Sequence, residues 1–395
     1  MGLSNHITER LMKQAMIERR PVKVNFELLP VCNLNCRMCY IRSDMDRVQA
    51  EGGLRPYEEW LRLAEEMREA DVLFLLLTGG EVFLYPGFRD LYEQLYRMGF
   101  LLTINTNATL INEKAVSWLA QYPPKCVSIS LYGADNETYR KLCGQEGMFT
   151  RVDHAVRLLR ESQIAVELKT MFTPLNAADA ENCIKYAAEL GIPYETAAYA
   201  FPPVRKEKAG GNREEESTAG KQSPSEQAAE KQIRFTPEEA VRCTFECSRL
   251  MSDDTDYAQG IVNHLKKYEK TRKNPGHLNK GFHCAAANNS CWITWQGHMT
   301  PCAMMNEPYT LPFVHGFADS WEKLKEKTDS ILLSAECSYC EKRAVCTVCP
   351  ASALAETGHF DGTSLYHCRM TELTFDAMYR YMKKYHLNIG KEDNP

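Results

Sequence analysis

Three cysteines near the N-terminus are spaced in a way that suits an iron–sulfur cluster. Cys32, Cys36 and Cys39 form a C-x3-C-x2-C pattern directly after an extended apolar segment. Three thiolates on one short loop can hold three irons of a cubane cluster, which leaves the fourth iron open to a small chelating molecule. A zinc knuckle is the alternative, but it needs a fourth ligand at matching spacing, and the nearest histidines are His6 and His154.

Eight further cysteines follow in the last third of the chain, in the patterns C-x6-C-x5-G-x4-C and C-x2-C-x5-C-x2-C with one later cysteine. They are Cys284, Cys291, Cys302, Cys337, Cys340, Cys346, Cys349 and Cys368. Eight thiols make two full sets of four. Two zinc ribbons are the alternative, but those favour paired C-x2-C motifs, whereas one compact run flanked by single cysteines suits two interleaved sites.

The composition of the 395-residue chain is that of a globular protein with one large domain and a smaller one. A net charge of −5 argues against nucleic-acid binding as the main task. The sequence shows neither a secretory signal nor a long apolar run, so we expect a cytoplasmic protein with no membrane segment. In that compartment, 16 cysteines favour metal binding over disulfides.

Residues 24–203 alternate between short apolar runs and amphipathic stretches, which predicts six β/α units. The run at 71–77 suits a strand buried on both faces, and the stretch at 55–70 has helical periodicity. Such an order implies an α/β fold, a partial (β/α)6 TIM-like barrel, with its site at the carboxyl ends of the strands. The polar candidates that follow such ends are Cys32, Gly79, Gly80, Glu81, Asn107 and Ser130.

Composition also sets the expected domain boundaries. An N-terminal extension (1–23) precedes the barrel, and a charged linker (204–233) that is poor in apolar residues follows it and is predicted to be disordered. A helical bridge (234–281) leads to the cysteine-rich Fe–S cluster domain (282–370). A C-terminal helix and tail (371–395) complete the chain.

The C-x3-C-x2-C loop resembles that of the radical S-adenosylmethionine (SAM) superfamily. The resemblance implies that the open iron of a [4Fe–4S] cluster binds SAM, and that one electron cleaves SAM to a 5′-deoxyadenosyl radical. It implies that Gly79, Gly80 and Glu81 meet the amino group of SAM. A flavodoxin or ferredoxin is the expected electron donor.

The segment SISLYG resembles the SISMDG-like segment of that superfamily, with Tyr132 in place of the usual acid. The resemblance implies that Ser130 meets the ribose or the carboxylate of SAM, and that Arg140 pairs with the carboxylate. For Arg140, a solvated helix charge is the alternative. The further SAM contacts that the resemblance suggests are Asn107, Met38 beside the adenine, and Tyr40.

The C-terminal cysteines resemble the SPASM domain, an extension of radical SAM enzymes that mature peptides and proteins. The resemblance implies two auxiliary [4Fe–4S] clusters. It assigns Cys284, Cys291, Cys302 and Cys349 to the first cluster and Cys337, Cys340, Cys346 and Cys368 to the second. One gap departs from the pattern, since two residues rather than three separate Cys346 and Cys349. If Cys291 is not a ligand, the first cluster has an open iron.

The resemblance thus predicts a radical SAM enzyme that takes hydrogen from a peptide or protein and forms a crosslink or an oxidised product. A small-molecule substrate is an alternative, because few residues precede the first strand. An anaerobic sulfatase maturase would carry an Asp base where this chain has Ala303. Other candidate bases are Tyr132, His298, Glu307 and Asp361. A multi-cluster electron-transfer protein is the non-enzyme alternative, but it would need no SAM pocket.

Overall fold

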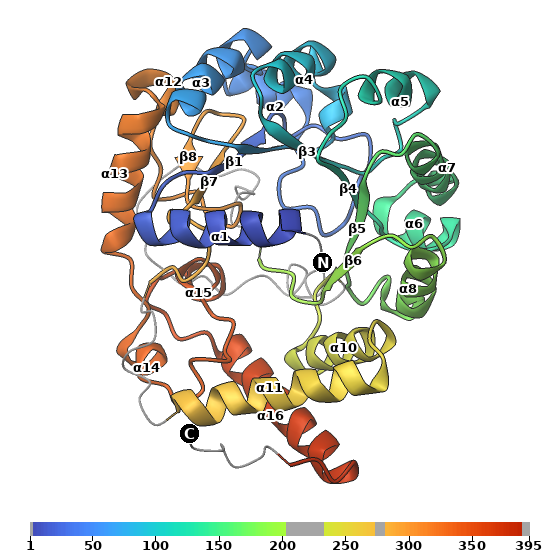
Figure 1. The fold of residues 1–395 in the computed structure, drawn as a ribbon, viewed down its shortest axis with the longest axis vertical. Coiled ribbons are helices and arrows are strands. Elements are labelled where there is room, and N and C mark those ends of the chain that lie inside the picture. The colour runs from blue at the N-terminus through green and yellow to red at the C-terminus, as the bar shows by residue number, and fades with distance from the viewer. Residues whose placement is uncertain (1–2, 203–232, 273–280, 389–395) are drawn as a thin grey trace.

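A computed structural model describes residues 3–202, 233–272 and 281–388. Six parallel strands in sequential order form a curved sheet with helices on its outer side (Figure 1), which confirms the partial (β/α)6 barrel. The strands are β1 (Lys23–Glu27), β2 (Phe74–Thr78), β3 (Leu101–Thr106), β4 (Cys126–Ser130), β5 (Val166–Met171) and β6 (Tyr194–Ala197).

The helices around the barrel follow from apolar periodicity and from capping residues. Asn112 and Asp135 each accept a hydrogen bond from the backbone N–H three residues on, which fixes where α5 and α6 begin. The sequence did not predict α2. The helices are α2 (Met45–Ala50), α3 (Tyr57–Glu69), α4 (Phe88–Arg97), α5 (Glu113–Leu119), α6 (Asn136–Cys143), α7 (Met148–Glu161) and α8 (Ala180–Glu189), with short 3-10 turns η1 (Val82–Leu84) and η2 (Ala177–Asp179).

The main core lies between the sheet and this layer of helices. Phe26 of β1 and Trp60 of α3 are fully buried, and their ring centroids lie 4.6 Å apart. Burial of a side chain of this kind contributes about 1.5–3 kcal/mol to folding. Since residues along a strand alternate in direction, the neighbours of Phe26, Asn25 and Glu27, face the inside of the barrel.

The C-terminal region extends the barrel sheet by two strands, which the sequence did not predict. β7 (Ser290–Ile293) pairs in parallel with β1, and β8 (Met299–Thr300) pairs antiparallel with β7. The Asn25 amide donates to the Cys291 carbonyl at 2.7 Å, and the Trp292 indole donates to the Glu27 carboxylate at 2.8 Å. The two buried polar side chains of β1 therefore have partners from the C-terminal region.

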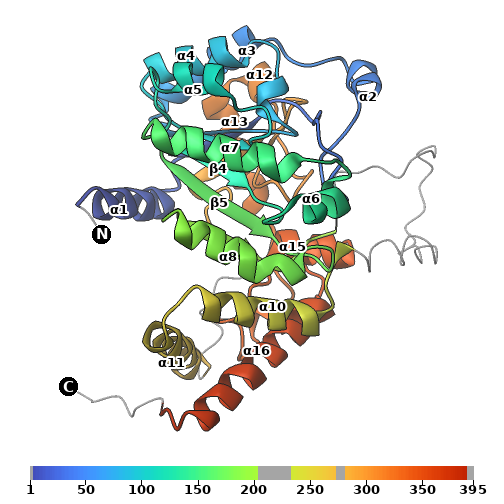
Figure 2. The ribbon, with the colours of Figure 1, turned by 90° about the vertical axis from the view of Figure 1, so that its right-hand side faces the viewer.

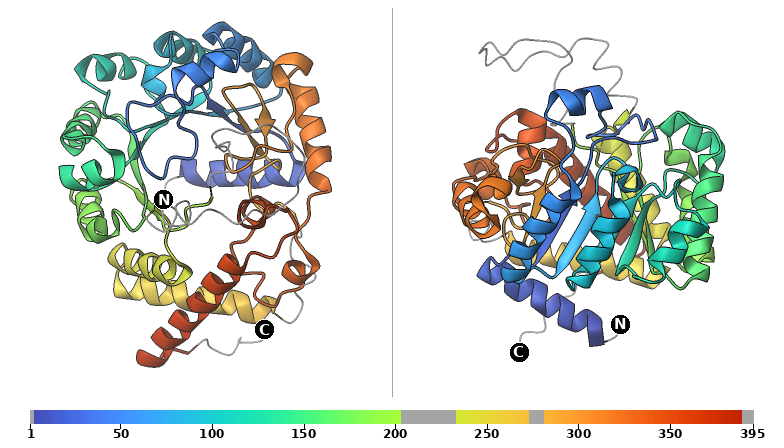
Figure 3. Two further views of the ribbon diagram at one scale, coloured as in Figure 1. Left: turned by 180° about the vertical axis from the view of Figure 1, so that it is seen from behind. Right: turned by 90° about the horizontal axis from the view of Figure 1, so that it is seen from above.

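The N-terminal extension forms a helix, α1 (Leu3–Glu18), that lies across the end of the barrel opposite α2 (Figure 3). Its end is tied to the C-terminal region. Arg19 pairs with Asp329 at 2.6 Å, and the Trp321 indole donates to the Arg19 carbonyl at 3.1 Å. The Asn289 amide donates to the Met12 carbonyl at 2.9 Å.

A group of helices packs below the barrel (Figure 2). At the start of α10 (Pro237–Leu250), Thr236 and Glu239 form a capping box. The helices of the C-terminal region are α10 (Pro237–Leu250), α11 (Asp254–Thr271), α12 (Pro312–His315), α13 (Phe317–Asp329), α14 (Ala335–Ser338), α15 (Pro350–Thr357) and α16 (Leu365–Lys384).

A mostly buried ion pair of the C-terminal region also receives a hydrogen bond from the barrel. Arg234 pairs with Glu356 of α15, and the guanidinium lies 4.1 Å from the centre of the Tyr366 ring. The Tyr199 hydroxyl, just after β6, donates to the same Glu356 carboxylate at 2.6 Å. This contact fixes the end of the last barrel strand against α15.

Two of the expected domain boundaries do not coincide with the limits of described elements. The boundary at residue 370 falls inside α16, so it does not coincide with the end of an element. Nearly all of the predicted linker (204–233) lies outside the described residues. Within the described ranges, no helix has the length and apolar character needed to cross a bilayer.

Candidate active site

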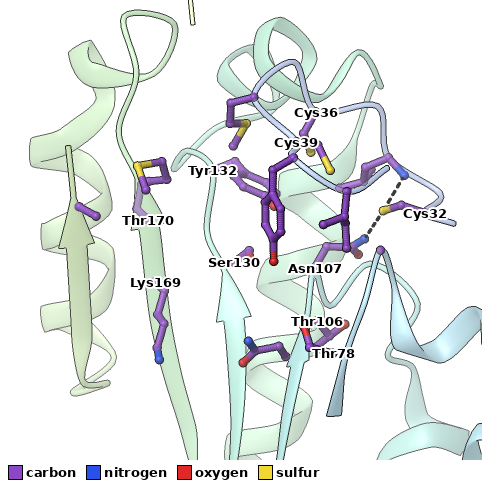
Figure 4. A pocket seen from close by; sticks show the side chains of 18 of the residues that line it. Cys32, Cys36, Cys39, Thr78, Thr106, Asn107, Ser130, Tyr132, Lys169 and Thr170 are labelled. Carbon is purple, nitrogen blue, oxygen red and sulfur yellow. Dashed lines mark hydrogen bonds between the residues drawn. The ribbon is translucent and has the colours of Figure 1, made fainter. Parts of the chain in front are cut away.

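A cavity of about 410 Å³ opens at the carboxyl ends of the barrel strands. The cysteine loop covers one side of it, and β5 and β6 form the other side (Figure 4). The cavity collects ten of the predicted residues, although Glu81 and Arg140 do not line it. Those that do are Cys32, Cys36, Met38, Cys39, Tyr40, Gly79, Gly80, Asn107, Ser130 and Tyr132.

The cysteine loop is held by backbone bonds rather than by regular structure. The Asn35 N–H donates to the Cys143 carbonyl at 3.1 Å, and the Arg37 N–H donates to the Leu142 carbonyl at 3.0 Å. These two bonds anchor the loop on both sides of Cys36 to the end of α6. The Gln145 amide also donates to the backbone of the loop, at the Asn33 carbonyl.

Gly79 and Gly80 allow β2 to run directly beside the chain that leads into the cysteine loop. The Gly80 N–H donates to the Leu29 carbonyl at 2.8 Å, and Gly79 has a φ of +154°. A Cβ atom at Gly79 would clash with the Leu29 carbonyl, and one at Gly80 would clash with that of Val31. The two glycines are therefore required by close backbone approach as well as being predicted SAM contacts.

Glu81 is turned into the protein instead of into the cavity. Its fully buried carboxylate accepts hydrogen bonds from the Thr106 hydroxyl at 2.7 Å, the Asn107 N–H at 2.8 Å and the Phe83 N–H at 3.2 Å. Burial raises the pKa of Glu81, and these hydrogen bonds oppose the rise. In this structure Glu81 joins the ends of β2 and β3.

Hydrogen-bond donors surround the sulfurs of the cysteine loop. The Cys32 sulfur accepts from the Asn107 amide at 3.6 Å and from the Leu34 N–H at 3.4 Å, as the dashed lines in Figure 4 show. The Cys39 sulfur accepts from the Arg42 N–H at 3.3 Å. Burial raises the pKa of the Cys32 thiol to about 12, and a bound cation such as iron would favour its thiolate form.

The sulfur of Cys36, the middle cysteine of the loop, has a neighbour that the sequence did not reveal. The sulfurs of Cys36 and Cys143 lie 3.5 Å apart, and the Tyr132 hydroxyl is within hydrogen-bonding reach of Cys36. Contact with Cys143 lowers the pKa of Cys36, whereas contact with Cys36 and burial raise the pKa of Cys143. Cys143 thus sits directly behind the middle cysteine of the loop.

Arg140 lies outside the cavity. Its side chain is exposed on α6 and pairs with Glu137 at 2.7 Å. The structure therefore agrees with the alternative of a solvated helix charge, and the site described here is built without Arg140.

We expect the substitution Arg140→Ala to change the Kd for SAM by less than about threefold, because an exposed ion pair contributes little. Equilibrium dialysis of cluster-loaded protein measures this Kd. Gly80→Ala provides the contrast, since the added Cβ pushes on the loop backbone and should greatly weaken binding. A large loss with Arg140→Ala would place that side chain in the SAM site.

Sequence reasoning missed the side of the cavity formed by β5 and β6. Lys169 and Glu195 are the charged side chains among the lining residues, and they lie 3.5 Å apart. Ser130, Lys169 and Glu195 are paired in register across β4, β5 and β6. Figure 4 shows the Lys169 side chain pointing along β5 away from the cysteines. Only the strand register, which one sequence does not reveal, brings these residues to the site.

A second cavity, of about 180 Å³, gathers one of the two predicted cysteine sets. Cys337, Cys340, Cys346 and Cys368 all line it. Burial raises the pKa of Cys368, and the charges of Cys337, Cys346 and Cys340 raise it further. A cavity surrounded by four thiols suits the predicted second auxiliary cluster.

The cysteines of the other predicted set, that of the first auxiliary cluster, are brought together less completely. Cys284 and Cys349 lie close enough for Cys349 to raise the pKa of Cys284, after the larger effect of burial. Cys291 is fully buried in β7, paired in register with Val24 and facing the main core. Its role as an iron ligand stays a prediction.

In the described part of the chain, no three His, Cys, Asp or Glu side chains are placed to hold a metal ion.

Comparison with known proteins agrees with the geometry of the cysteine loop. Residues 26–187 match the sequence profile of the radical SAM superfamily. This match places a radical SAM domain at residues 26–187. A radical SAM enzyme of this kind requires a [4Fe–4S] cluster and SAM, and the residues present fit both groups. Three thiols share one cavity with two glycines that leave its edge free of side chains.

Three proteins similar to this chain differ in how much of it they match. The AdoMet-dependent heme synthase of Methanosarcina barkeri is 24% identical over 86% of this chain and 94% of its own length. The subtilosin biosynthesis protein AlbA of Bacillus subtilis is 26% identical over 43% of this chain and only 38% of its own length. The crystal structure of SuiB from Streptococcus suis, at 16% identity, superposes with a TM-score of 0.60 over 90% of this chain and 80% of SuiB.

Proposed function

We propose that this protein is a radical SAM enzyme whose active site is the cavity at the carboxyl ends of the barrel strands. The observation that carries the proposal is the joint lining of that cavity by the C-x3-C-x2-C cysteines, the two glycines after β2, Asn107 and Ser130. When bound, the cluster and SAM supply a 5′-deoxyadenosyl radical that takes hydrogen from the substrate. Cys32, Cys36 and Cys39 would hold the cluster.

The residues around the cavity have distinct tasks in this proposal. Gly79 and Gly80 leave backbone groups accessible to the methionine part of SAM, and Ser130 offers a hydroxyl on the next wall. Glu81 positions Asn107 through the backbone, and Asn107 in turn donates to the Cys32 sulfur. Met38, Tyr40 and Phe201 supply an apolar side, on which the Tyr40 and Phe201 ring centroids lie 5.5 Å apart.

We further propose that the C-terminal region carries auxiliary [4Fe–4S] clusters. The cavity lined by Cys337, Cys340, Cys346 and Cys368 supports one of them directly. Cys284, Cys302 and Cys349, with or without Cys291, would hold the other. Such clusters would exchange electrons with the substrate or with a flavodoxin or ferredoxin.

A peptide or protein is the proposed substrate. The relatives AlbA and SkfB of Bacillus subtilis are named for bacteriocin biosynthesis and for sporulation killing factor maturation. SuiB has been solved with S-adenosylmethionine and with its precursor peptide SuiA. The anaerobic sulfatase maturase activity has less support, because Ala303 cannot act as a base.

A small-molecule substrate is the second candidate, and one observation favours it. The match to the heme synthase covers 94% of that protein, whereas the match to AlbA covers 38% of AlbA. The likeness to the heme synthase therefore extends over twice as much of this chain as the likeness to AlbA, 86% against 43%.

The first test is anaerobic purification with iron and sulfide quantitation, followed by reduction with SAM present. We expect about twelve irons per chain, four for each cluster, together with 5′-deoxyadenosine. About four irons with SAM cleavage would contradict the auxiliary clusters alone. Zinc in place of iron, without 5′-deoxyadenosine, would contradict the whole proposal. An electron-transfer protein would bind iron but would not cleave SAM.

The same protein can then be used to distinguish the two substrate classes. Incubation in deuterated buffer with SAM and either a candidate precursor peptide or a porphyrin carboxylate measures substrate-dependent 5′-deoxyadenosine. A modified peptide detected by mass changes would support maturation. Stimulation by the porphyrin carboxylate alone would support the second candidate.

A further inference from the structure

The cysteine that lies behind the cluster loop is fixed in place by the fold. Cys143 is the last residue of α6, which Asp135 caps at its start and Gly144 ends in the left-handed conformation. Backbone bonds from Asn35 and Arg37, on either side of Cys36, end at Cys143 and Leu142. Backbone pairing therefore holds the backbones of Cys36 and Cys143 side by side, and in this arrangement their sulfurs lie 3.5 Å apart.

The two cysteines of this contact are shielded from solvent. Cys143 is fully buried, and Cys36 is 9% exposed. At 3.5 Å the two sulfurs are far beyond the disulfide bond length of about 2.05 Å, and they are at the distance of a hydrogen bond to sulfur. Cys143 stands behind the loop and does not line the cavity.

We propose that Cys143 is a positioning residue that donates an S–H hydrogen bond to the iron-bound sulfur of Cys36 and thereby raises the reduction potential of the radical SAM cluster. The inference rests on the proposed function, in which Cys36 is an iron ligand. A thiolate bound to iron has no proton to donate, so the direction of the bond is fixed from Cys143 to Cys36.

The physical effect follows from where the added electron resides. Reduction increases negative charge on the cluster and on its sulfurs, and a hydrogen bond donated to a sulfur stabilises that charge. Other donors near the loop sulfurs include the Leu34 and Arg42 N–H groups, which substitution leaves in place, and two side chains that line the cavity, the Asn107 amide and the Tyr132 hydroxyl. Cys143 is the donor that can be removed without altering the cavity lining.

The test is a potentiometric titration of the full cluster-loaded enzyme, followed by electron paramagnetic resonance. The radical SAM cluster is identified as the reduced signal that changes when SAM is added. We expect Cys143→Ala to lower the ratio of reduced to oxidised cluster about tenfold at a fixed potential, which is 59 mV for one electron. Cys143→Ser keeps a donor and should retain most of the wild-type potential.

Cys183→Ala is the matched control, since Cys183 is another fully buried barrel thiol, on α8. If Cys143→Ala binds less iron, Cys143→Val, which fills the same space without a donor, gives the comparison. An unchanged potential in both apolar variants, or an equal shift in Cys183→Ala, would overturn the inference. A wild-type enzyme without a SAM-responsive signal would instead contradict the proposed function.

Discussion

Replacing Cys32 by Ala should abolish SAM cleavage, with no 5′-deoxyadenosine above the enzyme-free background. Each cysteine of the loop is proposed to hold one iron, and a cubane with two protein ligands has no stable site in this cavity. We also expect the iron content to fall by about four per chain, while the iron of the auxiliary clusters is retained. Anaerobic iron quantitation and chromatography of the reaction measure both results.

Cys126→Ala is the control for this substitution, because Cys126 begins β4 and lies outside the active-site cavity. It should keep its full iron content and SAM cleavage. If Cys32→Ala retained all iron and cleaved SAM, the loop would not be the site of the SAM-binding cluster. If it lost all of the iron, the clusters would load together, and single variants would not separate them.

The second large effect is expected at Glu81, and it is an effect on stability. Glu81→Ala leaves the Thr106 hydroxyl and the Asn107 N–H without their buried acceptor, as well as the Phe83 N–H. Unsatisfied buried donors cost about 1–3 kcal/mol each, so we expect the free energy of unfolding to fall by about 3–5 kcal/mol. Urea denaturation of the cluster-free protein, followed by circular dichroism, measures the change.

Glu81→Gln is the conservative comparison, since it keeps one acceptor oxygen in the same place. We expect Glu81→Gln to lower the free energy of unfolding by about 1–2 kcal/mol, because the NH2 group of the new amide would face hydrogen-bond donors and could not accept from them. If Glu81→Ala and Glu81→Gln were equally stable, the hydrogen bonds between β2 and β3 would not be what Glu81 provides. A loss of SAM affinity without any loss of stability would favour the predicted direct contact with SAM.

The barrel could be predicted from sequence because its signals are local. Apolar runs such as residues 101–106 coincide with a strand, and Asn112 and Asp135 cap helices as their types suggest. The residues after the strand ends were predicted to meet at one edge, and all of them except Glu81 line the cavity.

What the sequence did not reveal depends on register and on distant contacts. Lys169 joins the cavity only through the pairing of β5 with β4 and β6, and Cys143 lies 107 residues from its neighbour Cys36. Arg140 was predicted to pair with the carboxylate of SAM and is exposed in the structure; an arginine on an amphipathic helix has the same local sequence pattern whether it faces a ligand or solvent. Glu81 was predicted to meet a ligand, but the orientation of a side chain after a strand depends on which neighbour supplies the donors.

The parallel pairing of β1 with β7 has a consequence for the order of synthesis. The bond from Asn25 to Cys291 spans 266 residues, so β1 has an unpaired edge while the barrel emerges from the ribosome. At about 5–20 residues per second, this interval is about 15–50 s. An exposed edge strand is a site for wrong pairing and aggregation during that time. A chain that stops before residue 290 would keep this edge permanently, so removal of the C-terminal region is expected to cost solubility as well as clusters.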